Sequence, residues 1–170
     1  MSLNLKAASL ARHVISVFSR RGLTLVTAES LTGGLIGATL TSVPGASAVY
    51  WGGAITYATA MKTSALGVRI ETIDESSVIS SQTVTEMALG AQQNTGADFA
   101  LAVTGVAGPD PQDGHCPGEV WVGLACPRDG IIGKVISRGF TFSGNRSQIR
   151  WQTVVEALDM LLEEVLDEVA

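Results

Sequence analysis

A chain of 170 residues lies within the usual size range of a single domain, and its 46% hydrophobic content is enough for a full-sized core. Aromatic residues make up only 5% of the chain, whereas glycines number 19, a balance that suits helices packed closely on a buried sheet. A net charge of -5 with only three lysines excludes the extended basic surface that a nucleic-acid backbone requires. We therefore expect one α/β domain over residues 1–170 and no nucleic-acid partner.

Cysteine usage and hydropathy predict the compartment. Cys116 and Cys126 lie outside any C-x-x-C pattern, and two thiols without a secretory signal are typical of a reducing environment. The N-terminal pattern is amphipathic, and no window reaches the roughly 18 consecutive apolar residues of a membrane span. We expect a cytoplasmic protein that has neither a structural disulfide nor a membrane partner.

Helical and extended patterns alternate along the first half of the chain. Periodicity and short apolar runs predict helices over residues 4–21, 32–40 and 60–66, and strands over 23–28 and 48–57. Gly22 follows the first helix where a C-terminal glycine is expected. Each of the two strands is thus followed by a helix, which is typical of a parallel sheet.

The second half adds a hairpin. The patterns predict helices over residues 83–95 and from about 145 onward, strands over 99–103, 120–126 and 131–142, and a long exposed loop over 105–118. Thr83 and Glu86 have the spacing of a capping box. The acidic residues of the last helix form a solvated face. The order of elements predicts a three-layer α/β/α sandwich with a mixed, mostly parallel sheet.

In such a sheet, ligands bind beyond the carboxyl ends of the strands, so the residues that follow each strand are the first candidates. Ser30 follows the first predicted strand and precedes Gly33 and Gly34, whose flexible backbone lets N–H groups approach a ligand. A plain helix cap explains this serine equally well. Lys62 lies in a stretch of small and apolar residues, where desolvation would lower its pKa and make it a base, although an exposed lysine is the simpler interpretation.

The candidate serine needs a proton acceptor. His13 lies within the first predicted helix and His115 in the long loop, so Ser30 and Lys62 form the natural pair, a variant of the serine triad. Further along the chain, Arg146 and Arg150 are spaced to share one face at the start of the last helix, which is favourable for phosphate, although surface ion pairs would explain them too.

Metal and cofactor motifs are absent from the sequence: it has no P-loop, no H-E-x-x-H and no G-x-G-x-x-G that opens a helix. Four residues of the long loop could in principle bind a metal, but their spacing is irregular; they are Asp110, Asp113, His115 and Cys116. We expect neither a metal nor a cofactor.

Four segments carry a resemblance to a known family. They are residues 27–34 (Thr-Ala-Glu-Ser-Leu-Thr-Gly-Gly), 78–91 (with Glu-Met-Ala at 86–88), 104–110 (Thr-Gly-Val-Ala-Gly-Pro-Asp) and 142–146 (Phe-Ser-Gly-Asn-Arg). In this order and spacing, they resemble the competence-damage-inducible CinA C-terminal domain family over nearly the whole chain. The resemblance implies a hydrolase that converts nicotinamide mononucleotide to nicotinic acid mononucleotide and ammonia in pyridine-nucleotide salvage.

The same resemblance implies roles for single residues. Ser30 corresponds to the nucleophile and Lys62 to its base, while Tyr57 and Thr104 would position the substrate or the base. Backbone N–H groups of the glycine-containing turns would bind the oxyanion or the nucleotide, and the arginines would hold the 5′-phosphate. The expected substrate-binding residues are Glu29, Thr32, Gly33, Gly34, Gly105, Gly108, Arg146 and Arg150.

The chain departs from the family pattern at three places. Ala58 and Thr59 stand where the family commonly has Ser-Asn, His115-Cys116-Pro117 replaces the usual Lys-Pro-Val, and Asn145 replaces Asp. The first change removes polar groups near the proposed base. A nucleotide-binding or regulatory module with weakened turnover, and an amidase for another small amide, therefore remain alternatives. The high mean hydropathy also predicts a homo-oligomer.

Overall fold

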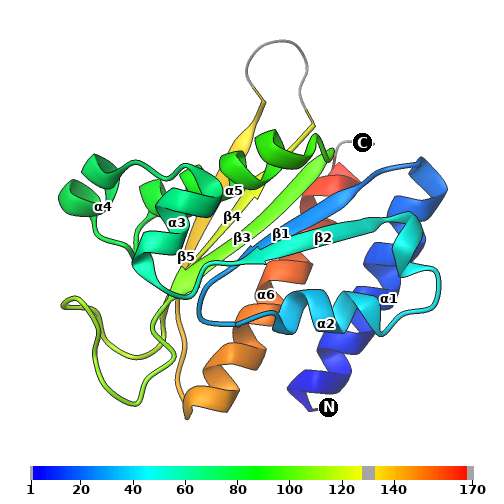
Figure 1. Cartoon of the computed structure of the whole chain (residues 1–170). Helices are drawn as coiled ribbons and strands as arrows, with labels where there is room; N and C mark the ends of the chain where they lie inside the picture. Colours follow the sequence, from blue (N-terminus) through cyan, green and yellow to red (C-terminus); the bar gives the residue numbers. More distant parts are fainter. Residues whose placement is uncertain (1, 128–132, 168–170) are drawn as a thin grey trace.

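The computed structural model describes residues 2–127 and 133–167, in which helices alternate with strands (Figure 1). The strands are β1 (Leu25–Glu29), β2 (Tyr50–Ile55), β3 (Phe99–Gly105), β4 (Glu119–Ala125) and β5 (Val135–Thr141). The helices are α1 (Leu3–Arg21), α2 (Leu35–Thr41), α3 (Thr59–Leu66), α4 (Ile70–Ser76), α5 (Ser81–Thr95) and α6 (Arg146–Asp167), with a short 3-10 turn, η1, at Ala46–Ala48.

The strands form one mixed sheet in the order β2-β1-β3-β4-β5. β1 pairs in parallel with β2 and with β3, whereas β4 runs antiparallel to β3 and to β5. The carboxyl ends of the three parallel strands therefore meet at one edge, at the left of Figure 1. The predicted α/β class, with a parallel first half and an antiparallel hairpin, is confirmed.

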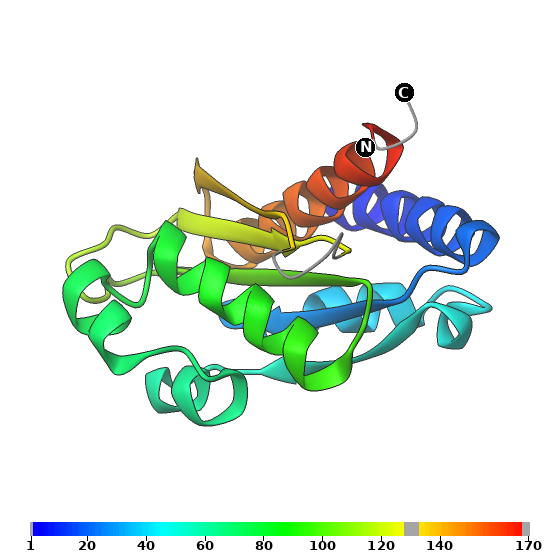
Figure 2. The same cartoon turned by 90° about the horizontal axis from the view of Figure 1, so that it is seen from above.

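Helices cover both faces of this sheet and make the predicted three-layer sandwich. α1, α2 and α6 pack together on one face, while α5 covers the other and is itself contacted by α3 and α4. Figure 2 shows the sheet between α5 on one side and α1 with α6 on the other. Within the described part of the chain, none of these helices combines the length and the apolar character needed to cross a membrane.

The two faces bury side chains of different size. On the α1/α6 face, Phe18 and Phe99 meet edge to face with ring centroids 5.3 Å apart. On the α5 face, the core consists largely of alanine and valine, so the helices lie close to each other. A Cβ atom at Gly90 of α5 would lie 1.8 Å from the carbonyl oxygen of Leu66 at the end of α3. This glycine therefore sets how closely α3, which carries Lys62, approaches the rest of the fold.

Several boundaries differ from those expected. α4 was not predicted, because it is only two turns long and Thr72 is its one fully buried residue. α2 begins at Leu35 rather than at residue 32, because Gly33 and Gly34 adopt left-handed conformations with φ of 59° and 94°. β2 begins at Tyr50, after η1. The predicted hairpin turn and the start of its second strand, at 128–132, lie outside the described residues.

Candidate active site

Ser30 lies directly beyond the end of β1, the strand flanked by both parallel neighbours. Its backbone N–H donates to the carbonyl oxygen of Val103 at 3.1 Å, which continues the β1–β3 pairing by one residue. The side chain is buried, with 8% of its surface exposed. The end of the strand thus fixes the backbone from which the Ser30 hydroxyl projects.

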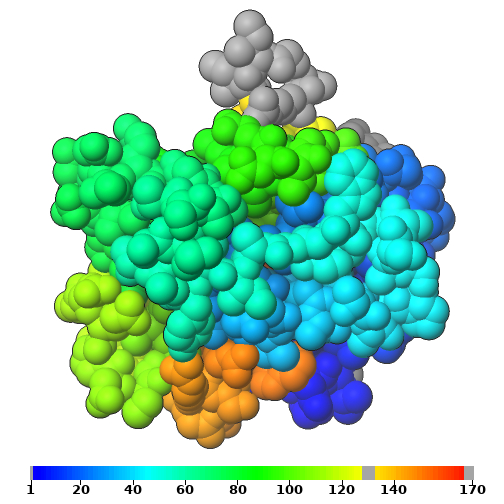
Figure 3. Space-filling view, viewed as in Figure 1, coloured from blue at the N-terminus to red at the C-terminus, as the bar shows by residue number. Residues whose placement is uncertain are grey.

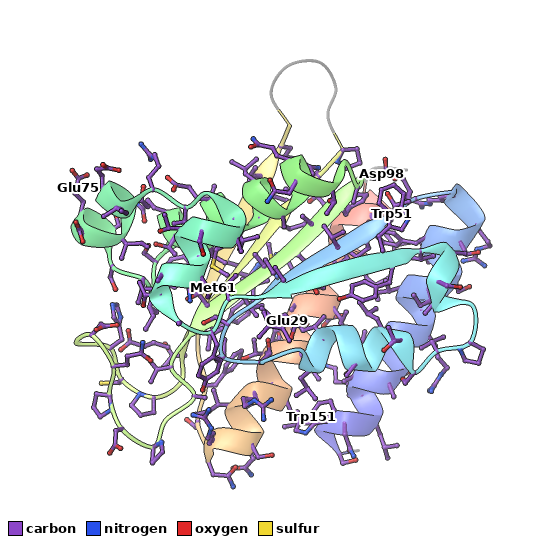
Figure 4. All side chains as sticks on the ribbon, viewed as in Figure 1. Glu29, Trp51, Met61, Glu75, Asp98 and Trp151 are labelled. Atoms are coloured by element: carbon purple, nitrogen blue, oxygen red, sulfur yellow. The ribbon has the colours of Figure 1, made fainter. Side chains whose placement is uncertain are left out.

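Glu29 holds the turn that follows. Its carboxylate, 1% exposed, accepts hydrogen bonds from the backbone N–H groups of Gly34, Ile36 and Gly37 at 3.0, 3.0 and 2.8 Å. Figure 4 shows Glu29 between the end of β1 and α2. These are N–H groups at the start of α2 that have no partner within the helix, and the buried carboxylate supplies their acceptor. The position of α2 relative to β1 follows from this contact.

Arg150 of α6 holds the same turn from the other side. Its Nε donates to the carbonyl oxygen of Leu31 at 3.1 Å, and its Nη2 donates to that of Thr32 at 2.6 Å. Charge-assisted hydrogen bonds of this kind are stronger than neutral ones. The turn after Ser30 is therefore fastened to α2 through Glu29 and to α6 through Arg150.

Lys62 of α3 reaches Ser30 across the end of the sheet. Its Nζ lies 3.0 Å from the Ser30 Oγ and donates to the Thr56 carbonyl oxygen at 2.8 Å. The Thr56 N–H in turn donates to the carbonyl oxygen of Glu29 at 2.8 Å. Only 1% of Lys62 is exposed. Burial disfavours the charged amine and lowers the pKa of Lys62 to about 8.

The paired side chains open into a pocket of about 280 Å³. Its walls are the ends of β1 and β3, the long loop, the β2–α3 connection with α3, the α4–α5 connection and the first residue of α6. The segments of α3, the long loop and the start of α6 meet on the face drawn in Figure 3. The lining residues are Ser30, Leu31, Tyr57, Lys62, Val78, Ile79, Thr104, Gly105, Val106, Ala107, Gly108, Pro109, Asp110, Pro111, Gln112 and Arg146.

Polar contacts organise the pocket rim. The Arg146 guanidinium donates to the Tyr57 hydroxyl at 2.6 Å and to the Gly108 carbonyl oxygen at 2.8 Å, so it bridges the β2–α3 connection and the long loop. Thr104 is 1% exposed, and its hydroxyl donates to the Val78 carbonyl oxygen at 2.9 Å. The Arg146 guanidinium thus stands at the mouth of a pocket whose floor holds Ser30 and Lys62.

Seven of the expected site residues line this pocket: Ser30, Tyr57, Lys62, Thr104, Gly105, Gly108 and Arg146. Five do not, namely Glu29, Thr32, Gly33, Gly34 and Arg150. The N–H of Gly33 donates to the Ser30 carbonyl oxygen at 3.0 Å, and that of Gly34 donates to Glu29. These N–H groups and the Arg150 guanidinium bond to the protein itself, so the five residues belong to the turn after Ser30 or contact it, outside the pocket lining.

Sequence reasoning missed part of the wall. Val78 and Ile79 line the pocket from the α4–α5 connection, and Thr56 supplies the carbonyl that anchors Lys62. The first two are ordinary apolar residues, so no sequence signal marks them. Thr56 acts through its backbone, and the one signal that could have found it is its position just before Tyr57, near the end of a predicted strand.

Of the four loop residues weighed as metal ligands, His115 has partners on both ring nitrogens. His115 lies 2.7 Å from a carboxylate oxygen of Glu119 through its Nδ1 and 2.9 Å from the Ser77 hydroxyl through its Nε2. Over residues 2–127 and 133–167, no group of three or more His, Cys, Asp or Glu side chains is arranged to hold a metal ion.

Comparison with known proteins identifies the family. The model of the CinA C-terminal domain matches residues 7–165. The chain belongs to the CinA C-terminal domain family. It is 44% identical over 153 residues to a CinA-like protein of Frankia casuarinae and 42% identical over 154 residues to one of Geotalea uraniireducens, in each case over 90% of this chain. The chain spans only about a third of the length of these curated relatives, 34% and 36% respectively.

Solved structures of the CinA family have the same fold. A competence/damage inducible protein from Agrobacterium tumefaciens is 39% identical, with a TM-score of 0.87 over 93% of this chain and 94% of that one. A CinA superfamily protein from Klebsiella pneumoniae is 32% identical, with a TM-score of 0.89 over 95% and 98% of the two chains. The expected family is therefore confirmed by sequence and by structure.

Proposed function

We propose that this CinA domain is an amidohydrolase that converts nicotinamide mononucleotide to nicotinic acid mononucleotide and ammonia. The observation that carries the proposal is the 3.0 Å contact between the Ser30 Oγ and the Lys62 Nζ at the floor of a pocket. This distance suits proton transfer between a nucleophile and its base. A lysine whose pKa is lowered to about 8 is neutral in about a tenth of the molecules at pH 7, and the neutral amine accepts a proton.

In the first half of the reaction, the Ser30 Oγ attacks the carbonyl carbon of the carboxamide and its proton passes to the Lys62 Nζ. The Oγ–C bond forms, and the C–N bond breaks when Lys62 returns the proton to the leaving nitrogen, which departs as ammonia. In the second half, water attacks the acyl-serine and gives its proton to Lys62. The C–Oγ bond then breaks as Lys62 passes that proton to the Oγ, so the carboxylic acid leaves and the Ser30 hydroxyl is restored.

The rim supports the choice of a phosphorylated substrate. Arg146 stands at the pocket mouth, where its guanidinium can exchange the Tyr57 hydroxyl and the Gly108 carbonyl for phosphate oxygens, which it binds more strongly. A pocket of about 280 Å³ suits the nicotinamide ring and its amide, with the ribose and the phosphate toward the opening. Ala58 and Thr59, where the chain departs from the family pattern, are exposed and do not line the pocket.

Ammonia release from nicotinamide mononucleotide by the purified protein tests the proposal, beside Ser30→Ala and the control Ser9→Ala, which changes an exposed serine of α1. We expect release by the wild type and Ser9→Ala, and at least a 1,000-fold loss in Ser30→Ala. Binding of the nucleotide by calorimetry without release would favour a regulatory module instead. Absence of both would direct the search to other small amides.

The expected homo-oligomer stays a prediction. Trp51, Ile55, Tyr57 and Met61 expose apolar surface from β2 to α3, next to the pocket rim. Light scattering on the purified protein determines the oligomeric state directly.

A further inference from the structure

A second serine, Ser77, begins a chain of hydrogen bonds outside the Ser30–Lys62 pair. Its Oγ lies 2.9 Å from the Nε2 of His115, and the Nδ1 of the same ring lies 2.7 Å from a carboxylate oxygen of Glu119. The three residues come from the end of α4, the long loop and the start of β4. A nucleophile, a base and a group that orients the base, each within hydrogen-bond distance of the next, make the arrangement of a serine triad.

Neighbouring backbone groups decide which way the protons point. The N–H of Cys116 donates to the second carboxylate oxygen of Glu119 at 2.9 Å and, together with His115, lowers the pKa of Glu119. The ionised carboxylate accepts the Nδ1 proton of the ring, which leaves Nε2 as an acceptor. The Ser77 Oγ accepts a hydrogen bond from the Ile79 N–H at 3.2 Å, so its own proton is available to Nε2.

The backbone of Ser77 is strained. Its φ of 77° and ψ of 153° lie in a region that is adopted almost only by glycine and that costs a side-chain-bearing residue about 1–3 kcal/mol. Neighbours hold it there: the Ser77 N–H donates to the Ile73 carbonyl oxygen, and the Ser77 carbonyl oxygen accepts from the hydroxyls of Ser80 and Thr83. Strain of this kind at a serine is a feature of nucleophiles on tight turns.

A hollow of about 570 Å³ gives Ser77 access to solvent. It lies between α4 and the long loop, at the left of Figure 4, where Glu75 marks α4. Its described lining includes the carboxylates of Asp74, Glu75 and Asp113 and no basic side chain. This negative surface repels anions such as nucleotide phosphates and favours neutral or cationic molecules.

We propose that Ser77, His115 and Glu119 form a second acyl-transfer site, which takes small neutral or cationic activated esters. The Ser77 Oγ attacks the ester carbonyl carbon, its proton moves to the His115 Nε2, and the ester C–O bond breaks as that proton passes to the leaving oxygen. Water then attacks the acyl-serine, with His115 accepting and returning the proton, and the acid is released. The N–H of Val78, which follows the nucleophile, donates to no described residue and is available to the oxyanion.

The test uses the whole chain with Ser30→Ala as background, so that the first serine cannot react. Hydrolysis of p-nitrophenyl acetate and labelling by diisopropyl fluorophosphate, with the labelled peptide located by mass spectrometry, report on Ser77. We expect label on Ser77 and none after Ser77→Gly. Glycine adopts the same φ without strain, so this variant keeps its fold. His115→Gln should slow the labelling of Ser77 about 100-fold or more.

Controls separate this site from the proposed amidohydrolase. With Ser9→Ala in the same background, the reagent should label Ser77 at an unchanged rate. The Ser77→Gly variant, with Ser30 intact, should retain ammonia release from nicotinamide mononucleotide. If the reagent does not label Ser77, or labels it equally fast in His115→Gln, the proposal is overturned and the three residues have only a structural role. Neither result depends on whether Ser30 hydrolyses the amide.

Discussion

The two strand–helix connections that supply Ser30 and Lys62 are built in opposite ways. Around Ser30, a buried carboxylate and a guanidinium bond to five backbone groups of the turn and of α2. Around Lys62, the amine has the Ser30 hydroxyl and one carbonyl, of Thr56, as partners, and Ala58 at the start of α3 provides no side-chain cap. Hydrogen bonds position the proposed nucleophile, whereas burial lowers the pKa of the proposed base.

Lys62→Met should remove the buried amine beside Ser30 and have the largest effect on activity. Ammonia release should fall at least 1,000-fold, equivalent to about 4 kcal/mol of transition-state stabilisation. The folded chain should nevertheless gain up to about 3 kcal/mol at pH 7, because the charged amine is disfavoured in the fold. Steady-state kinetics and urea unfolding measure the two quantities.

Two controls accompany Lys62→Met. Lys62→Arg keeps a cation that does not lose its proton and should be equally inactive. For the wild type, the pKa of Lys62 falls from 10.5 to about 8 on folding, so its destabilising contribution is complete below pH 8 and disappears as the pH rises toward 10.5. A stability gain in Lys62→Met that persists unchanged at pH 10.5 would contradict this assignment.

Glu29→Gln breaks the first arrangement. A glutamine has one carbonyl oxygen, and its NH₂ group would face backbone N–H groups whose hydrogen bonds the carboxylate accepts in the wild type. We therefore expect a loss of about 2–4 kcal/mol in the free energy of unfolding. Denaturant unfolding measures it, with Glu71→Gln on the exposed face of α4 as the matched control. A loss below about 1 kcal/mol would show that the carboxylate does not hold the turn.

Arg150→Met tests the other side of that turn. The methionine keeps the apolar length of the side chain but leaves the Leu31 carbonyl without this donor and the Thr32 carbonyl with only the Leu35 N–H, at a cost of about 1–3 kcal/mol. The KM for the nucleotide should stay the same, because Arg150 does not line the pocket. Arg146→Met should instead raise KM. An equal rise in KM for Arg150→Met would indicate that Arg150 binds the phosphate after all.

The pH dependence of kcat tests the role of Lys62 without any substitution, and it is the smallest of the expected effects. The reaction needs the neutral amine, so kcat should rise about tenfold per pH unit below pH 8 and level off above it, leaving about a tenth of the plateau at pH 7. Initial rates between pH 6 and 9.5 give the curve. A flat profile over this range would mean that Lys62 is not the base.

Local patterns made one half of this comparison predictable. Ser30 follows an apolar run and precedes two glycines, which predicted a strand, a turn and a helix. Lys62 is one of only three lysines in the chain, and it lies in a segment of small and apolar residues. The rule that ligands bind beyond the carboxyl ends of parallel strands then pointed to the residues after each strand, whereas the strand order was not predicted.

The roles of Glu29, Arg150 and Ser77 depend on contacts between residues that are distant in the sequence. Glu29 and Arg150 resemble ligands in the sequence because both are charged and lie near glycines or a helix start, yet their partners are backbone groups that only the packed α2 and α6 bring within reach. Ser77 gave no sequence signal at all. Its left-handed backbone and its contact with His115 exist because α4 ends where the long loop returns.

Backbone pairing beyond the strand ends has a consequence for the motions of the site. The amides of Ser30 and Thr56 donate to Val103 and Glu29 on neighbouring strands, so both belong to the sheet rather than to loops. Such amides exchange their hydrogens with solvent only when the central sheet unfolds as a unit. The amides of Ser30 and Thr56 should therefore be among the slowest-exchanging positions of the chain, and any opening that admits substrate should involve the pocket walls outside the sheet.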